Sequence, residues 1–408
     1  MGERKRILLI NSVANYGSTG HIVEAIGKSA QEFGWDCYLA CGERYSNESS
    51  LSLFYISSKT GQRIQMIHSL LTDRNGFSAK RATFRLIEWI KRLSPDIIHL
   101  HNLHGYYLNI SILFGYLNTV DIPVVWTLHD CWPITGHCCH FHSTGCEKWM
   151  SGCDHCSQSR QYPVSLFSDR SARNYLEKKA LFTANHNLHL VVVSEWMKMI
   201  ISKSFLKDCP ITVIPNGISM DVFHPLGISS DRLRVRYGLT GKCVLLGVAT
   251  RWWREKGYDD WLELKKILPE KYAVVMIGVN KRQQAECERL GILGLPKTEN
   301  IQSLVEWYSV ADVCMSLSHG ESFGLTLAES LACGTPVIAY GNTAQLELVS
   351  SNTGMIAEDR NVMDVLACLE TMAANRFSAD NCRNTAMKRF NQQENLRRYM
   401  ELYNSFIH

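Results

Sequence analysis

Short apolar runs alternate with helix-like patterns through the first half of the chain. An apolar run at residues 7–10 is followed by a glycine-containing segment at 16–20, and then by Ile22, Ile26 and Ala30 at four-residue spacing. Apolar residues four apart share one face of a helix. The pattern therefore predicts a strand, a glycine loop and a helix at the start of the chain.

The same alternation continues toward the middle of the sequence. A helix is predicted at 84–93 from apolar residues at three-residue steps, and it ends before Pro95 because proline disfavours a helical residue ahead of it. Continuous apolar runs predict buried strands at 96–101, 123–129 and 190–194. Buried strands that alternate with helices indicate a parallel sheet covered on both faces.

The pattern restarts in the second half, with strands predicted at 243–249, 272–278, 312–316 and 335–339. The fold class is therefore α/β, with two doubly wound domains joined by a linker near residues 210–225. In such sheets ligands bind beyond the carboxyl ends of the strands, so we expect the functional site in a cleft between the two domains.

Composition and charge narrow the function classes. The 408 residues are 46% hydrophobic and 20% charged, which is typical of a globular protein. Forty-three Lys and Arg against 39 Asp and Glu give a net charge of +4, too small for a dedicated nucleic-acid binder. The apolar run at 7–10 is too short for a signal sequence or membrane span, so we expect a cytoplasmic protein.

Two carboxylates eight residues apart mark the clearest candidate site. Glu321 and Glu329 flank a segment that follows a predicted strand and opens a helix. If the helix begins near Gly324, the free backbone N–H groups of Phe323, Gly324 and Leu325 suit a diphosphate. The spacing alone equally fits an amphipathic helix with two solvated glutamates.

The Glu321–Glu329 segment resembles the E-x7-E signature of the retaining glycosyltransferases of family 4. That resemblance implies the GT-B architecture, in which two Rossmann-like domains face each other and a C-terminal helix crosses back to the first. Four further motifs fit in chain order: the glycines at 17–20, Thr127–Asp130, Ile214–Ile218, and Arg251 with Lys256–Gly257.

The resemblance gives the domains their bounds and roles. Residues 1–209 would form an acceptor-side domain with a cysteine-rich insertion at 131–156, and 210–388 a domain that binds the nucleotide sugar. Residues 389–408 would form the helix that crosses back.

A narrower resemblance is to the bacterial colanic-acid and capsular-polysaccharide branch of the family. It implies transfer of a sugar from a nucleotide-sugar donor to a lipid-linked saccharide, in the synthesis of a bacterial surface polysaccharide. The segments that carry this resemblance are Trp126–Pro133, Gly136–Cys138, Gly145–Trp149, Gly152–Cys153 with Cys156, and Tyr162–Pro163.

The reaction itself indicates what Arg251 and Lys256 do. Breaking the bond between a sugar and a nucleoside diphosphate builds negative charge on the leaving phosphates. Arg251 and Lys256 can neutralise that charge together with a helix N-terminus, and the resemblance likewise implies catalysis without a metal. The residues around Arg251, however, depart from the usual glycine-rich approach, as in Trp252 and Trp253.

The resemblance assigns the other site residues. Glu321 would accept hydrogen bonds from the donor sugar, Glu329 from the ribose, and His129 would face the donor sugar from the first domain. Gly17 would let the backbone approach the donor diphosphate.

Two more residues belong to the acceptor side. Gly20 would let the backbone approach the acceptor, although a turn without a ligand explains both glycines nearly as well. Asp130 would orient the nearby backbone or hold the acceptor. The sequence does not identify a protein nucleophile.

The cysteines raise a separate question. Six of fifteen fall within residues 131–156, and four of them, Cys138, Cys146, Cys153 and Cys156, suit a structural zinc site because Cys153 and Cys156 have the two-residue gap that zinc sites favour. His137, His140, His142 and His155 are alternative ligands. Unligated thiols or disulfides remain open as well.

Two other segments suggest partners. Residues 63–92 are basic and amphipathic, which fits either a peripheral contact with the cytoplasmic membrane face or an ordinary solvated helix face. Residues 393–406 match the crossing helix of the family.

Two competing interpretations remain. One is a nucleotide-sugar epimerase of the same fold, and the other is a non-catalytic nucleotide-binding module stabilised by zinc. The binding module would take nucleotides or nucleic acid, whereas the glycosyltransferase interpretation involves no nucleic-acid partner.

Overall fold

The computed structural model describes residues 4–227, 231–358, 360–375 and 377–407, and the chain divides into two compact units. The first comprises Met1–Ile214 with Leu396–His408, and the second comprises Pro215–Asn395. The sequence placed the first boundary five residues earlier, after residue 209. Among the described residues, every helix is too short or too polar to span a bilayer.

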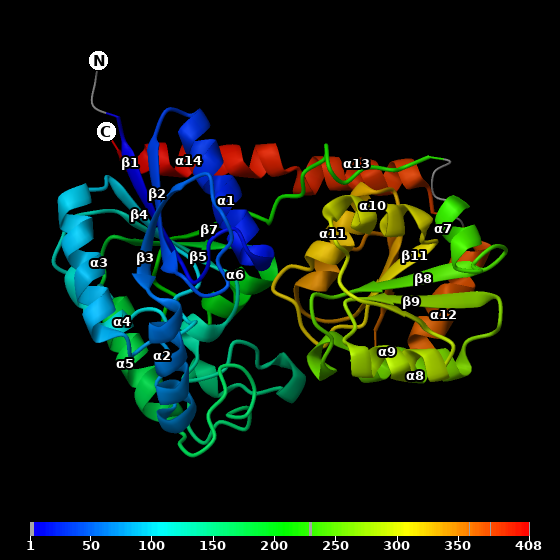
Figure 1. Ribbon diagram of the computed structural model, residues 1–408, viewed down its shortest axis with the longest axis horizontal. Coiled ribbons are helices and arrows are strands. Elements are labelled where there is room, and N and C mark those ends of the chain that lie inside the picture. Colours follow the sequence, from blue (N-terminus) through cyan, green and yellow to red (C-terminus); the bar gives the residue numbers. More distant parts are fainter. Residues whose placement is uncertain (1–3, 228–230, 359, 376, 408) are drawn as a thin grey trace. The chain divides into compact units, whose positions relative to one another are not determined.

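The first unit contains a seven-stranded parallel sheet in the order β3-β2-β1-β4-β5-β6-β7 (Figure 1). Its strands are β1 (Arg6–Asn11), β2 (Asp36–Gly42), β3 (Ser52–Ser57), β4 (Ile97–Leu100), β5 (Val124–Leu128), β6 (Leu188–Val192) and β7 (Ile211–Val213). Strand β6 begins and ends two residues earlier than expected, because its buried stretch starts at Leu188.

The helices of this unit are α1 (Gly17–Glu32), α2 (Lys59–Thr72), α3 (Lys80–Leu93), α4 (Ile110–Leu117), α5 (Ser171–Thr183) and α6 (Glu195–Ile201). Short 3-10 turns are η1 (Trp132–Ile134), η2 (His142–Thr144) and η3 (Lys148–Met150). The expected glycine loop is shorter than the sequence suggested: Gly17 is the first residue of α1 and Gly20 lies inside it. A Cβ at Gly20 would lie 3.4 Å from the Asn15 backbone, so the first helical turn packs against the preceding loop.

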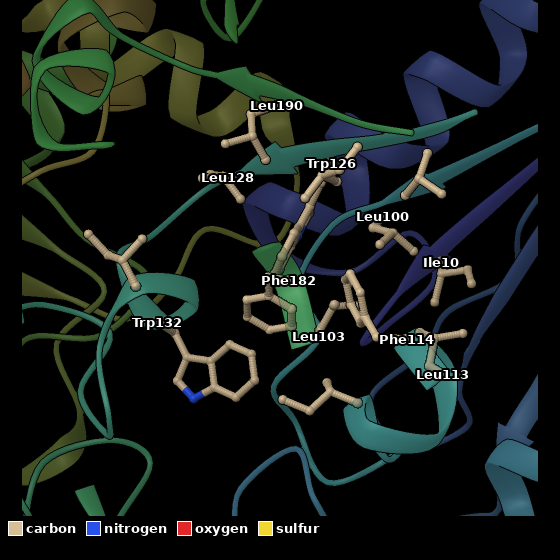
Figure 2. Close-up of a cluster of buried hydrophobic side chains, with 14 of the residues drawn as sticks. Ile10, Leu100, Leu103, Leu113, Phe114, Trp126, Leu128, Trp132, Phe182 and Leu190 are labelled. Carbon is tan, nitrogen blue, oxygen red and sulfur yellow. The ribbon is translucent and has the colours of Figure 1, made fainter. Parts of the chain in front are cut away.

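Successive side chains of β1 point to opposite faces of the sheet, as in any pleated strand. Leu8 and Ile10 belong to a core with α3, α4 and α5, and Figure 2 shows its aromatic centre. There the Phe182 ring lies 4.6 Å from Phe114 and 4.9 Å from Trp126 between ring centres. Such tilted and edge-on pairs add to the stabilisation from burial alone.

The opposite face is covered by α1 and by the C-terminal helix α14 (Gln392–Phe406). Tyr399, Met400 and Tyr403 of α14 are buried against Ile7 and Leu9 of β1. The segment predicted at 393–406 is therefore a helix that returns to the first sheet.

A buried histidine ties α14 to the sheet. His99 of β4 pairs through Nδ1 with the Tyr403 hydroxyl at 2.6 Å, and through Nε2 with the Thr127 hydroxyl at 2.8 Å. Burial lowers the pKa of His99 well below its usual value, so the ring is neutral at pH 7. Both ring nitrogens are thus satisfied only while α14 is docked.

The second unit contains a six-stranded parallel sheet in the order β10-β9-β8-β11-β12-β13. Its strands are β8 (Cys243–Val248), β9 (Tyr272–Ile277), β10 (Leu293–Leu295), β11 (Val313–Ser316), β12 (Val337–Tyr340) and β13 (Gly354–Ala357). Its helices are α7 (Asp231–Arg236), α8 (Tyr258–Ile267), α9 (Lys281–Arg289), α10 (Ile301–Val310), α11 (Leu325–Ala332), α12 (Val362–Ala374) and α13 (Ala379–Phe390), with 3-10 turns η5 (Arg254–Lys256) and η6 (Thr343–Glu347).

We predict that Tyr403→Phe destabilises the first unit. The change removes only the hydroxyl and leaves Nδ1 of buried His99 without its partner, at a cost of about 1–3 kcal/mol. Urea unfolding followed by tryptophan fluorescence measures the loss. The exposed Tyr55→Phe is the matched control, and equal midpoints for both variants would contradict this role of Tyr403.

Candidate functional site

The candidate site of the second unit lies at the carboxyl edge of its sheet. Strand β8 ends at Val248 and leads into the segment with Arg251 and Lys256, while β11 ends at Ser316 and leads into the segment with Glu321. Neighbouring parallel strands deliver these segments to the same edge. The strand and the helix expected on either side of the Glu321 segment are confirmed.

These two loops are locked together by backbone contacts. The Glu255 carbonyl accepts hydrogen bonds from the Ser318 hydroxyl at 2.9 Å and from the His319 N–H at 2.8 Å. Gly257 follows with φ of +72°, and a Cβ there would lie 2.1 Å from the Leu317 carbonyl oxygen. Only glycine permits this close approach.

The locked loops bring two predicted site residues into contact. The Lys256 ammonium forms an ion pair with the Glu321 carboxylate at 2.5 Å. The Glu321 N–H donates to the Thr343 hydroxyl at 2.9 Å, which ties the loop to η6. Both charged side chains remain partly exposed, so a ligand can reach them. Arg251 is exposed and lies between the end of β8 and Lys256.

Helix α11 begins at Leu325, shortly after Glu321, and free backbone N–H groups lie at its N-terminus. Its N-cap is Gly324, with φ of +107° and no capping side chain. Within the described part of the chain, no acceptor is found for the N–H groups of Phe323, Gly324 and Leu325. A helix N-terminus carries about half a positive charge, so these donors suit an anion.

Glu329 lies further along α11 and is held from α10. The Tyr308 hydroxyl donates to its carboxylate at 2.7 Å. Burial raises the pKa of Glu329 to about 7, and the hydrogen bond from Tyr308 opposes that rise. The carboxylate that is expected to bind the ribose is thus held by Tyr308, a residue that the sequence analysis did not single out.

In the first unit, His129 follows the carboxyl end of β5. Its Nε2 lies 3.1 Å from Nδ1 of His101, which follows β4, and the two rings stack with centres 5.4 Å apart. Burial lowers the pKa of His129 to about 4, which keeps the ring neutral near pH 7. Its charge state therefore does not change around neutral pH.

Asp130 belongs to a second buried network. Its Oδ2 lies 2.7 Å from His104 Nε2, its Oδ1 accepts from the Trp132 N–H at 2.9 Å, and His104 Nδ1 lies 3.0 Å from the Tyr162 hydroxyl. Burial alone would raise the pKa of Asp130, but the contact with His104 lowers it to about 2. Asp130 is therefore an ionised carboxylate that orients His104.

Several of these partners were missed by sequence reasoning. His101, His104 and Tyr162 on the first unit, and Tyr308 and Thr343 on the second, all contact predicted residues. A signal was available for two of them, because three histidines at 99, 101 and 104 accompany the end of one strand. Tyr162 lies in a segment that carries the narrower resemblance, although no site role was assigned to it there, and Tyr308 and Thr343 follow no recognisable spacing.

A cavity of the second unit lies elsewhere. It measures about 670 Å³ and is lined by Cys243, Tyr272, Val313 and Pro336, which lie at or before the amino ends of their strands. It therefore lies at the opposite edge of the sheet from Lys256 and Glu321. Ligand binding in parallel sheets favours the carboxyl edge.

Comparison with known families identifies the chain. Residues 21–222 match the profile described as Glycosyltransferase Family 4, and residues 230–389 match that described as Glycosyl transferases group 1. The chain is a family 4 glycosyltransferase. It is thus an enzyme of the glycosyl-transferring class that uses a nucleotide-sugar donor, and members of this family usually need no metal.

Two curated relatives illustrate the range of similarity. The glycosyltransferase is 25% identical over 311 residues, 72% of each chain, to an Escherichia coli K12 protein named as a colanic acid biosynthesis glycosyl transferase, WcaC. It is 23% identical over 213 residues, covering 50% of this chain and 56% of the other, to a Campylobacter jejuni protein. That protein is named N,N'-diacetylbacillosaminyl-diphospho-undecaprenol alpha-1,3-N-acetylgalactosaminyltransferase.

Solved structures show the fold. A sucrose-phosphate synthase from Thermosynechococcus elongatus aligns with a TM-score of 0.74 at 16% identity, covering 98% of this chain and 99% of that one. HepE of Anabaena, solved with UDP, aligns with a TM-score of 0.68 at 14% identity, covering 98% and 100%. The expected α/β GT-B fold of the glycosyltransferase is confirmed.

We predict that the Glu329→Gln variant changes how stability depends on pH. The raised pKa means that the folded state holds a proton between pH 4.5 and 7 that the unfolded state releases, so this stabilisation is lost as pH rises through 7. An uncharged glutamine does not lose stability in this way. Above pH 7 the free energy of unfolding of the variant should therefore rise, relative to that of the wild type, by at most about 3 kcal/mol.

Thermal unfolding of both proteins at pH 4.5, 6 and 8 measures the difference. A difference in melting temperature that stays constant across this range would contradict the raised pKa. Glu288→Gln, an exposed glutamate on α9, is the matched control.

Proposed function

We propose that this glycosyltransferase extends a bacterial surface polysaccharide by moving a sugar, with retention of configuration, from a nucleoside diphosphate to a lipid-linked saccharide. The observation that carries the reaction is the Lys256–Glu321 ion pair beside the free N–H groups at the start of α11. This arrangement supplies a cation, an anion and oriented donors at one edge of one sheet.

The diphosphate would bind at the positive part of this arrangement. Negative charge grows on the leaving phosphates as the bond to the sugar breaks, so groups that neutralise it lower the barrier. Lys256 has three N–H donors and can hold a phosphate oxygen while it keeps its contact with Glu321. Arg251 and the amides of residues 323–325 would complete the set.

The two glutamates would hold the uncharged parts of the donor. Glu321 would accept hydrogen bonds from hydroxyls of the transferred sugar, since its carboxylate lies beside the phosphate-binding cation. Glu329, with one oxygen bound by Tyr308, would offer the other to the ribose hydroxyls. Both assignments follow the family pattern in the sequence.

The first unit would contribute the acceptor-side residues. His129 is neutral near pH 7, so it would act as a hydrogen-bond partner for a sugar hydroxyl rather than as a cation. Asp130 and His104 would hold the neighbouring wall, and Gly17 and Gly20 would shape the approach at the start of α1.

Retention is consistent with a reaction without a protein nucleophile. The acceptor hydroxyl would attack from the face that the diphosphate leaves, the bond between the sugar and the phosphate oxygen would break, and that oxygen would take the hydroxyl proton. Lys256 would stabilise the departing charge throughout. This mechanism needs no metal, which accords with the usual behaviour of the family.

The acceptor class is supported by the two curated relatives. The name of one refers to colanic acid biosynthesis, and the name of the other contains a diphospho-undecaprenol acceptor. A lipid-linked acceptor requires the enzyme to work at a membrane surface. We place that work at the cytoplasmic face, where nucleotide sugars are available.

The face that would contact the membrane lies on α2. Ile64, Ile67 and Leu71 are exposed at three- and four-residue spacing, and therefore lie on one face of the helix. Leu166 and Phe167 are exposed beside its end, where the Leu166 N–H donates to the Leu70 carbonyl at 2.9 Å. We call Ile64, Ile67, Leu71, Leu166 and Phe167 the α2 patch.

Basic residues accompany the α2 patch. Lys59 and Arg63 are exposed on the same helix. An exposed apolar face beside basic residues suits an anionic bilayer, into which the apolar side chains insert while the charges meet lipid phosphates. The expected peripheral membrane contact is thus assigned to α2.

We predict that Lys256→Ala and Glu321→Ala each lower turnover by about 10²–10³-fold, because each removes a group aligned with the reacting bond. The measurement is nucleotide release from a panel of UDP-, GDP-, ADP- and dTDP-sugars, with and without a lipid-linked acceptor. Lys271→Ala and Glu288→Ala, exposed and outside the site, are the controls.

Turnover that survives in both site variants would contradict the proposed site. If the wild type shows no turnover even with acceptor present, and the two site variants only lose affinity for the donor, the protein is a binding module. Interconversion of the donor sugar without an acceptor would indicate an epimerase.

We predict that Ile67→Asp weakens binding to vesicles that contain phosphatidylglycerol, because it puts a charge in the centre of the α2 patch. Co-sedimentation with anionic and neutral vesicles measures this, and we expect at least a tenfold loss on the anionic ones. Phe33→Asp, an equally exposed apolar residue at the far end of α1, is the control. Equal binding by both variants would contradict the assignment.

A further inference from the structure

Four cysteine side chains line a single small cavity in the first unit. The cavity measures about 100 Å³ and lies among η2, η3 and the start of α5. All four cysteines are free thiols. They are Cys138, Cys146, Cys153 and Cys156, the four that the sequence singled out.

The thiols interact with one another as well as with the cavity. Cys138 and Cys156 share a hydrogen bond, and Cys153 lies close enough to both Cys146 and Cys156 to interact electrostatically. Thiols that line one cavity in this way can converge on a common ligand.

A histidine on the same cavity has an unused nitrogen. His137 is 2% exposed, and its Nδ1 lies 2.5 Å from the Asp73 carboxylate. Its Nε2 is buried and has no hydrogen-bond partner among the described residues. A buried polar atom without a partner is costly, so its presence on the cavity wall calls for an acceptor there.

A buried cation also lies near the thiols. The Lys178 ammonium on α5 is fully buried and donates to the carbonyls of Trp132 at 2.7 Å and Thr135 at 3.0 Å. It interacts electrostatically with Cys138 and Cys153. A zinc ion held by four thiolates carries a net charge of −2, which a buried ammonium and a histidine N–H would offset.

We propose that Cys138, Cys146, Cys153 and Cys156 bind one Zn²⁺ ion as four thiolates, and that His137 donates an Nε2–H hydrogen bond to one of them. Binding replaces four S–H protons by four zinc–sulfur bonds, and the protons go to solvent. Asp73 accepts the Nδ1–H of His137, so the ring donates from Nε2 as well only as an imidazolium, paired with the Asp73 carboxylate.

The thiols draw closer together when they bind the ion. Within the described ranges, three potential ligand atoms lie within 4.8 Å of one another only at His104, Asp130 and Cys139. There His104 and Asp130 already bond to each other, and Tyr162 and Trp132 satisfy their remaining atoms. That group therefore needs no metal, whereas the cavity has four thiols and an unpartnered nitrogen.

The ion would fix the segment that carries Tyr162. Between Cys131 and Arg170 the chain forms only three 3-10 turns among its described elements, so few backbone hydrogen bonds hold it. Tyr162 follows Cys156 by six residues and contacts His104, the partner of Asp130. Zinc would thus be structural, and would position the acceptor-side network without touching the reacting atoms.

The first test is elemental analysis of full-length protein purified without chelators. We expect one zinc per chain in the wild type and in Cys209→Ser, a half-buried cysteine outside the cavity. We expect at least a tenfold loss of zinc in Cys146→Ser and Cys153→Ser. No stoichiometric zinc in the wild type, or equal zinc in all four proteins, would overturn the proposal.

The second test uses the wild type alone and so does not depend on the variants folding. Replacement of zinc by Co²⁺ in the wild type should give the intense ultraviolet sulfur-to-cobalt absorption of a four-thiolate site. Chelation should expose four additional thiols to a thiol reagent. Fewer than fifteen thiols in the denatured, unreduced protein would mean disulfides and would overturn the proposal.

Discussion

The contact between two loops at the carboxyl edge of the second sheet fixes the groups that would bind the donor. Glu255 accepts from Ser318 and His319, and Gly257 lets the backbone come against Leu317. Without that approach Lys256 would not reach Glu321. The ion pair is thus a consequence of backbone packing, and its geometry is set before any ligand binds.

The same logic operates in the first unit through buried histidines. His99 joins α14 to β5 through Tyr403 and Thr127, while His101 and His104 contact His129 and Asp130. Burial keeps His99, His101 and His129 neutral, so they serve as fixed hydrogen-bond partners. The C-terminal helix therefore supports the strand ends from which the acceptor-side residues project.

Much of this could be predicted from the sequence because strands and helix starts are local. The runs at 243–249 and 312–316 predicted β8 and β11, and the segment from Glu321 predicted a helix that begins beside Gly324. Five strands were missed: β2, β3, β7, β10 and β13. Strand β3 is exposed or half-buried along its first four residues, and β7 and β10 have only three residues each, so none of these three shows a continuous apolar run that is long enough to recognise.

Pair contacts were harder to predict because they join distant positions. The Asp130–His104 contact spans 26 residues, and the Glu329–Tyr308 bond links two different helices. Nothing in the spacing of Tyr308 marks it as the residue that shares the Glu329 carboxylate. Gly20 illustrates the opposite error, since glycines in sequence suggested a loop where the first turn of α1 had already formed.

The proposed mechanism requires that Lys256 and the start of α11 recognise a diphosphate. Calorimetric titration with the nucleoside, monophosphate and diphosphate of the accepted base tests this most directly. The diphosphate should bind at least ten times more tightly than the monophosphate, about 1.4 kcal/mol, and Lys256→Met should abolish that difference. Equal affinity for both nucleotides in the wild type would contradict the account.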